Sequence, residues 1–203
     1  PHDRSRILDA YDALARDPGI DAFAPDAVIR LGGVPTSKAL NQFLARATTA
    51  THVLCDAWSS FRDPQALASV VLHGDPGLTC HAIAAALPAP AASPDWCDAW
   101  VQRDRAARAA LREAALSFDE PFEGRVFVEL QALLPRGATI VAGNSMPVRD
   151  LDAFLACDDK SVTCIANRGA NGIDGVISTA LGVAAGAKGP VCLVIGDLSF
   201  YHD

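Results

Sequence analysis

The chain has 203 residues, half of them hydrophobic and only 6% aromatic, so its core must be built mainly from Ala, Val and Leu. A formal net charge of −7 at pH 7 argues against a nucleic-acid-binding protein, which would need a basic face. No apolar run approaches the length of a membrane span and no signal-peptide pattern opens the chain, so we expect a cytoplasmic protein. The six cysteines are scattered without metal-ligand spacing, which indicates free thiols.

The first half of the sequence predicts one α/β unit. Residues 27–31 form an apolar strand candidate, and Thr36 or Ser37 follows as the cap of a helix. The intervening glycine pair lacks the glycine-to-lysine spacing of a phosphate-binding loop, so we interpret the segment as an ordinary strand–turn–helix. Further along the chain, we expect strands at 52–55 and 69–73 and a helix at 78–86.

A proline-rich stretch at 87–94 is typical of a linker and divides the chain into two parts, 1–94 and 95–203. The second part opens with a long helix at 95–117, followed by an amphipathic helix at 122–134. We expect the arginines of the long helix to face solvent, namely Arg103, Arg105, Arg108 and Arg112.

Three apolar strand candidates end the sequence, at 138–142, 162–166 and 191–195, and each is followed at once by Gly and polar residues. The carboxyl ends of parallel strands lie along one edge of a sheet, so these polar residues should converge. The segment 167–175 contains three glycines and precedes a helix expected at 176–187, where backbone N–H groups could approach an anion. The fold class predicted is α/β, with two Rossmann-like three-layer units that have parallel sheets and are both incomplete in this fragment.

The polar residues at these strand ends predict a binding site. Asp197 follows a Gly at the end of a buried strand, a position suited to Mg²⁺, which is held by one or two carboxylates together with phosphate oxygens. Ser145 would donate a hydrogen bond to a cofactor or substrate, and Asn144 would shape the turn. Arg149 and Arg168 would bind carboxylates through their two-point guanidinium geometry, the alternative for each being a surface ion pair.

Three motifs closely resemble one enzyme family. They are Gly-Asn-Ser-Met-Pro-Val-Arg-Asp at 143–150, Asn-Arg-Gly-Ala-Asn-Gly-Ile-Asp-Gly at 167–175 and Gly-Asp-Leu-Ser-Phe-Tyr-His-Asp at 196–203. The family is that of the thiamine-diphosphate-dependent synthases of menaquinone biosynthesis, the 2-succinyl-5-enolpyruvyl-6-hydroxy-3-cyclohexene-1-carboxylate synthases. Residues 25–46 resemble the family's central domain more weakly, and Leu198 after Gly-Asp separates this family from other thiamine-diphosphate enzymes.

The resemblance implies an activity for the full-length protein. It would use thiamine diphosphate and Mg²⁺ (or Mn²⁺) to decarboxylate 2-oxoglutarate and add the succinyl carbanion to isochorismate. Asp197 would bind the metal, Ser199 or the backbone at Leu198 would hold the diphosphate or aminopyrimidine side, and Ile173 would wedge under the cofactor. Arg149 and Arg168 would bind substrate carboxylates.

The same resemblance limits what this chain does alone. The family's activating glutamate lies in an N-terminal domain, and a further metal-ligating asparagine lies beyond residue 203, so we assign no catalytic residue to this chain. Since the chain begins at Pro1, we expect an inactive fragment of a protein that forms a homodimer or homotetramer when full-length.

Two other interpretations remain open at this point. One is a different thiamine-diphosphate 2-oxoacid decarboxylase or an acetolactate-type synthase, which should lack an arginine pair for a dicarboxylate. The other is a non-catalytic Rossmann-like binding module.

Overall fold

The computed structural model describes residues 5–58, 62–87 and 94–203. They divide into two compact units, one formed by residues 11–103 and the other by the N-terminal segment up to residue 10 together with residues 104–203. Both units contain a parallel sheet with helices, so the predicted Rossmann-like α/β class is confirmed. The stretch 88–93 of the predicted linker lies outside the described residues, and helix α4 (Pro94–Ser117) contributes residues to both units.

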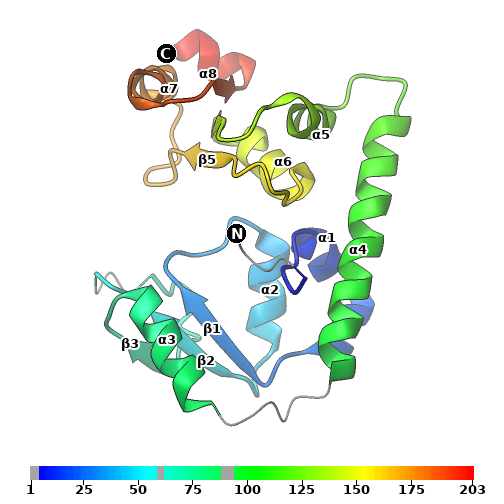
Figure 1. The fold of residues 1–203 in the computed structure, drawn as a ribbon, viewed down its shortest axis with the longest axis vertical. Helices are drawn as coiled ribbons and strands as arrows, with labels where there is room; N and C mark the ends of the chain where they lie inside the picture. Colours follow the sequence, from blue (N-terminus) through cyan, green and yellow to red (C-terminus); the bar gives the residue numbers. More distant parts are fainter. Residues whose placement is uncertain (1–4, 59–61, 88–93) are drawn as a thin grey trace. The chain divides into compact units, whose positions relative to one another are not determined.

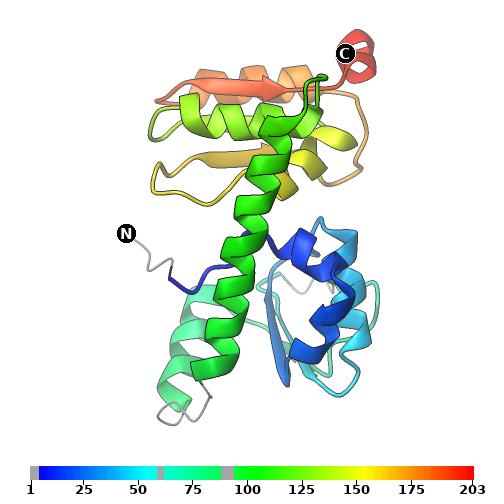
Figure 2. The same cartoon turned by 90° about the vertical axis from the view of Figure 1, so that its right-hand side faces the viewer.

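The unit of residues 11–103 is built on a three-stranded parallel sheet with the order β1-β2-β3. Its strands are β1 (Ala27–Leu31), β2 (Thr51–Cys55) and β3 (Val70–Leu72). Its other elements are α1 (Tyr11–Arg16), the 3-10 helix η1 (Pro18–Phe23), α2 (Lys38–Arg46) and α3 (Pro76–Ala86). In Figures 1 and 2, α2 lies on one side of this sheet and α3 on the other.

Ser37 fixes the start of α2. Its Oγ accepts a hydrogen bond from Leu40 N at 2.9 Å and donates one to Asp12 at 2.6 Å, so the hydroxyl joins α2 to α1 while it caps the helix. The glycine pair before it forms a turn, with Gly32 at a φ of +80°. The predicted strand–turn–helix is therefore confirmed, with Ser37 as the cap.

The prediction that the α4 arginines face solvent is wrong for Arg108, whereas Arg103 is exposed as predicted although it also contacts a ring. Arg108 is largely buried: its Nε donates to Asp9 Oδ1 at 2.8 Å and its Nη1 to the carbonyl of Ala153 at 2.9 Å. Arg103 lies over the ring of Phe23, with 4.3 Å between the guanidinium carbon and the ring centroid. The guanidinium groups of Arg108 and Arg103 therefore contact residues that are distant in the sequence. The remaining two arginines, Arg105 and Arg112, are exposed.

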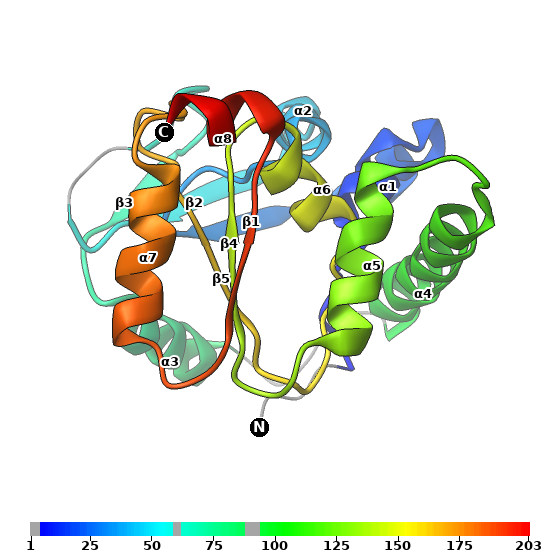
Figure 3. The same cartoon turned by 90° about the horizontal axis from the view of Figure 1, so that it is seen from above.

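The unit containing residues 104–203 has a parallel sheet in the order β5-β4-β6. Its strands are β4 (Thr139–Ala142), β5 (Thr163–Ala166) and β6 (Val191–Val194). Its helices, besides the end of α4, are α5 (Glu123–Leu133), α6 (Met146–Phe154), α7 (Val176–Gly186) and α8 (Asp197–His202). Figure 3 shows α7 on one face of this sheet and α5 with α6 on the other, which is the arrangement that right-handed crossovers to opposite sides of β4 require.

Every residue of the central strand β4 is buried, whereas β5 and β6 are half exposed. Cys55, Cys80, Cys164 and Cys192 are free thiols, and Cys164 on β5 is exposed although it lies within an apolar strand. Among the described residues, no helix combines the length and the hydropathy needed to cross a bilayer.

Candidate binding site at the carboxyl edge of β5-β4-β6

The three motif-bearing loops begin side by side. Ala142, the last residue of β4, is in register with Ala166 of β5 and Val194 of β6, so the carboxyl ends of all three strands lie at one edge of the sheet. From here the chain continues into three segments: the β4 loop (residues 143–145), the β5 loop (167–175) and the β6 segment (195–203, which includes α8). The predicted convergence is confirmed, and it occurs where the strand order reverses, the position at which open α/β sheets bind ligands.

Asn144 joins the β4 loop to the β5 loop. Its side chain is buried, with 5% of the residue exposed, and its Nδ2 donates to the carbonyls of Asn167 at 3.0 Å and Gly172 at 2.6 Å. Its Oδ1 accepts a hydrogen bond from Arg168 Nη1 at 3.1 Å. The sequence predicts only that Asn144 shapes its own turn, and the three bonds across to the neighbouring loop are a finding of the structure.

Ser145 has a backbone conformation that favours glycine. Its φ of +71° and ψ of −123° place it outside the regions that side-chain-bearing residues usually adopt. It occupies the position before the first residue of α6, but its hydroxyl makes no capping hydrogen bond. Such strain is retained where the surroundings enforce it and is concentrated at functional sites, so an exposed and uncommitted Ser145 hydroxyl is consistent with its predicted contact to a cofactor or substrate.

The β5 loop carries Arg168 and Ile173 at the same edge. Ile173 is 37% exposed, and a Cβ added at either Gly172 or Gly175 would meet no atom within 4 Å, so open space borders this loop. Arg149 is exposed in the second turn of α6, which starts directly from the β4 loop. The convergence of the two guanidinium groups on one pocket stays a prediction.

The β6 segment supplies a carboxylate and a hydroxyl. Asp197 is exposed at the first position of α8, where its Oδ1 accepts a hydrogen bond from Leu198 N at 2.8 Å, and Leu198 itself is 74% exposed. Ser199 is buried, yet its Oγ has no hydrogen-bond partner within the described part of the chain. Because a buried unpaired hydroxyl costs free energy, this atom fits a polar ligand group at the edge.

A metal at Asp197 would need ligands in addition to the side chains of this chain. Within residues 5–58, 62–87 and 94–203, no three His, Cys, Asp or Glu side chains are grouped as a metal site. This agrees with the type of Mg²⁺ site in which one carboxylate shares the ion with phosphate oxygens and water.

The N-terminus of α7 is already capped by a carboxylate from this chain. Asp203 accepts hydrogen bonds from Gly175 N at 2.8 Å and Ile177 N at 2.6 Å, and these bonds hold the pKa of its carboxyl below the usual value. The neighbouring His202 bonds to Asp174. In this structure the carboxylate of Asp203 occupies the helix terminus at which the glycine-rich sequence predicts an anion, and binding of a ligand anion there stays a prediction.

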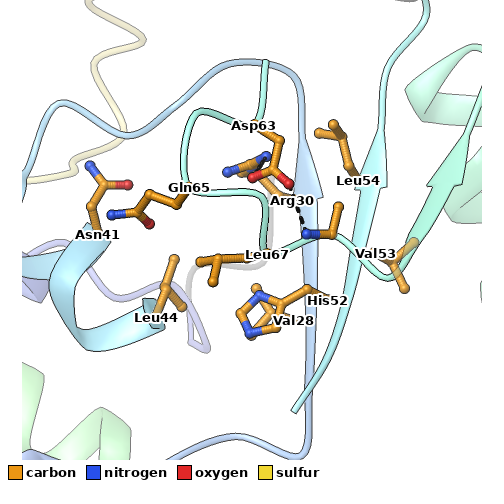
Figure 4. Close-up of a pocket in the computed structure, with 11 residues that line it drawn as sticks. Val28, Arg30, Asn41, Leu44, His52, Val53, Leu54, Asp63, Gln65 and Leu67 are labelled. Atoms are coloured by element: carbon orange, nitrogen blue, oxygen red, sulfur yellow. Dashed lines mark hydrogen bonds and ion pairs between the residues drawn. The ribbon is translucent and has the colours of Figure 1, made fainter. Parts of the chain in front are cut away.

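A small hollow lies in the other unit, but it is too small for a ligand. Figure 4 shows it between β1, α2 and the segment 62–68, with the ion pair of Arg30 and Asp63 (Nη2 to Oδ1, 3.0 Å) at its wall. Its volume of about 10 Å³ has room for one water molecule at most. Burial of Asp63 raises the pKa of its carboxyl, but the hydrogen bond from Ala68 N and the ion pair with Arg30 outweigh this and lower the pKa. These contacts hold the segment 62–68 in place at the wall of the hollow.

These features define the chain as an α/β protein of Rossmann-like architecture, with a polar site at the carboxyl edge of one parallel sheet. No protein-family model matches the chain. It is, however, similar over its whole length to curated proteins named 2-succinyl-5-enolpyruvyl-6-hydroxy-3-cyclohexene-1-carboxylate synthase. The chain is 43% identical over 203 residues to the one from Bacillus velezensis and 42% identical to that from Geobacillus thermodenitrificans, covering 35% and 34% of their lengths. It is 40% identical over 206 residues to the one from Chloroflexus aurantiacus, again covering 35% of it.

The chain belongs to the family of these synthases, as the resemblance of its three motifs predicts, and it spans about a third of the length of the curated relatives that it matches.

Proposed function

We propose that the full-length protein is a thiamine-diphosphate- and magnesium-dependent synthase of menaquinone biosynthesis. It decarboxylates 2-oxoglutarate and transfers the succinyl group to isochorismate. The observation that supports this most directly is the meeting of three family motifs at one sheet edge, where the β6 segment holds an exposed carboxylate and an unpaired buried hydroxyl and the β5 loop holds a guanidinium.

Each residue of the edge has a role in this proposal. Asp197 holds Mg²⁺ (or Mn²⁺), and Ser199 with the backbone of Leu198 holds the diphosphate. Ile173 supports the cofactor from the open side of the β5 loop, and Ser145 donates a hydrogen bond to cofactor or substrate. When bound, thiamine diphosphate supplies the nucleophilic carbon and the electron sink for decarboxylation, and the protein supplies position and charge.

Arg149 and Arg168 bind substrate carboxylates in this proposal. Both 2-oxoglutarate and isochorismate carry carboxylates, and a guanidinium can bind such a group through two parallel hydrogen bonds. Arg168 uses Nη1 on Asn144, which fixes the plane of the guanidinium and leaves its other N–H donors available.

The metal assignment is tested by Asp197→Asn in the full-length protein. The loss of one carboxylate oxygen charge should abolish Mg²⁺-dependent binding of thiamine diphosphate while the protein stays folded, as measured by isothermal calorimetry and circular dichroism. Asp119→Asn is a matched control, because Asp119 is an exposed carboxylate in the turn between α4 and α5. An unchanged cofactor affinity in Asp197→Asn would contradict the assignment.

Substrate turnover separates this proposal from its alternatives. The full-length protein should consume 2-oxoglutarate in the presence of isochorismate and should not consume pyruvate. Preference for pyruvate would indicate an acetolactate-type enzyme, and binding without any turnover would indicate a non-catalytic module. Residues 1–203 alone should show no turnover, because the activating glutamate is expected outside this segment.

A further inference from the structure

We propose that Asn144 is a positioning residue of the carboxyl-edge site, and that it acts through Arg168 and the β5 loop. The inference rests on the proposed function in one respect: the ligand of Arg168 is taken to be a substrate carboxylate. The placement of Asn144 itself rests only on the geometry of this chain.

The carboxamide of Asn144 is used on both of its ends. Its Nδ2 donates to the carbonyls of Asn167 and Gly172, which stand on either side of the segment that carries Arg168. Its Oδ1 accepts from the Arg168 guanidinium itself. One side chain therefore holds the backbone of the β5 loop at two points and also holds the loop's cation.

Asn144 is the buried member of this set of bonds. It is 5% exposed, whereas Arg168 and Gly172 are exposed, so the carboxamide reaches from the protein interior to an exposed part of the loop. Its backbone is anchored as well, because Gly143 N, one residue earlier, donates to Val194 O at 2.8 Å and a Cβ at Gly143 would lie 3.4 Å from Ile195 Cα. Asn144 therefore extends from a rigid junction of β4 and β6 toward an otherwise open loop.

Ser145 and Asn144, although adjacent, have opposite characters. The strained backbone of Ser145 leaves its hydroxyl exposed, whereas the polar atoms of Asn144 are directed to protein partners. A group with this pattern does not touch the substrate and affects it through Arg168. The effect of removing Asn144 should therefore depend on whether Arg168 is present.

A double-mutant cycle in the full-length enzyme tests this dependence. Asn144→Ala should lower kcat/KM about 10-fold for the same substrate whose kcat/KM falls in Arg168→Ala. The double variant should be no worse than Arg168→Ala alone. The inference would be overturned if the losses of kcat/KM in the two single variants multiply in the double variant. It would also be overturned if Asn144→Ala has wild-type kinetics while Arg168→Ala is impaired.

Asn41→Ala, in helix α2, is the control for the loss of a carboxamide that bonds two backbone carbonyls. Asn41 Nδ2 also donates to two backbone carbonyls, those of Pro35 and Ser37, both at 2.8 Å, but Asn41 has no arginine partner among the described residues. This variant should keep the kinetics of the wild type. If it shows the same loss of kcat/KM as Asn144→Ala, the effect belongs to general loop loosening and the inference fails.

A second readout needs no cofactor, substrate or activity. Trypsin cleaves after arginine, so the rate of cleavage at Arg168–Gly169, followed by mass spectrometry, reports how firmly the β5 loop is held. Cleavage should accelerate several-fold in Asn144→Ala and stay at the wild-type rate in Asn41→Ala. Equal cleavage rates in Asn144→Ala and the wild type would overturn the inference.

The two readouts separate the proposals. If the wild type shows no synthase activity and Asn144→Ala is cleaved faster than the wild type, the proposed function is refuted and the positioning role is retained. If the wild type has synthase activity, Asn144→Ala is cleaved at the wild-type rate, and the losses of kcat/KM in the two single variants multiply in the double variant, the proposed function is retained and the positioning role is refuted. Asn144→Ser, which is small and polar, carries the same comparisons where the alanine variant does not fold.

Discussion

Ser145 allows the carboxyl-edge site to be tested by separating stability from binding. Its φ of +71° and ψ of −123° are readily accessible to glycine, and a side-chain-bearing residue held in such a region costs about 1–3 kcal/mol. Glycine also lowers the free energy of unfolding by about 0.5–1 kcal/mol, because it increases the conformational freedom of the unfolded chain. Ser145→Gly should therefore raise the free energy of unfolding by about 1 kcal/mol, whereas Ser145→Ala should leave it unchanged.

Binding should respond differently from stability. Both variants remove the Ser145 hydroxyl, so both should weaken the interaction with cofactor or substrate by the worth of one neutral hydrogen bond, about 0.5–1.5 kcal/mol or roughly 2- to 13-fold. The assays are urea unfolding of the full-length protein for stability, and calorimetry with thiamine diphosphate together with KM for 2-oxoglutarate for binding.

Ser161→Gly provides a control with the same chemical change. Ser161 has a φ of +56° and is exposed in the turn before β5, so glycine should also be tolerated there without any effect on ligand binding. The reasoning is refuted if Ser145→Gly is no more stable than Ser145→Ala, because the backbone would then hold no strain. It is also refuted on the functional side if both Ser145 variants bind cofactor and substrate like the wild type.

Three further predictions follow from single contacts. Gly124→Ala should destabilise the protein by about 1–3 kcal/mol in urea unfolding, because the added Cβ would lie 2.5 Å from two ring carbons of Phe154; unchanged stability would contradict that packing. Asp203→Asn should abolish part of the acid dependence of stability. Because the pKa of Asp203 is lowered in the folded protein, its contribution to stability is present above the ordinary carboxyl pKa and is lost as pH falls through the lowered pKa. The melting temperatures of wild type and variant should therefore differ near neutrality and converge in acid. Arg149→Ala and Arg168→Ala should each lower kcat/KM roughly 10- to 150-fold with little change in thiamine diphosphate affinity, and lysine should rescue only partly; loss of cofactor with a normal KM would move these residues to the cofactor site.

The strands could be predicted from the sequence because their signal is local. Short apolar windows locate β1 to β6 within about two residues of their ends, and the helices α4, α5 and α7 are equally clear in the sequence. The short helices α1, α6 and α8 were not predicted. Six residues in α1 and α8 are too few for a helical period to stand out, and α6 begins at Met146 directly after a strained residue that no propensity rule indicates.

Long-range partners limited the prediction of side-chain roles. Arg108 looks like one of several solvated arginines until Asp9, 99 positions away, is placed beside it. Asn144 likewise finds its partners 23 to 28 positions along the chain, in a loop whose shape its own sequence does not reveal. The residue types at the sheet edge could be recognised from sequence, but the division of labour among them depends on contacts that only the folded chain forms.

Two segments of the carboxyl edge each combine a polar group committed to protein contacts with one that is not. The buried carboxamide of Asn144 precedes the exposed hydroxyl of Ser145, and the capping carboxylate of Asp203 belongs to the same segment as Ser199, whose hydroxyl has no partner among the described residues. The committed groups fix the loops, which removes the entropy cost of ordering them when a ligand arrives. The uncommitted groups are then held in place with unused hydrogen-bonding capacity, so the free energy that the fold has not gained from them is available for binding.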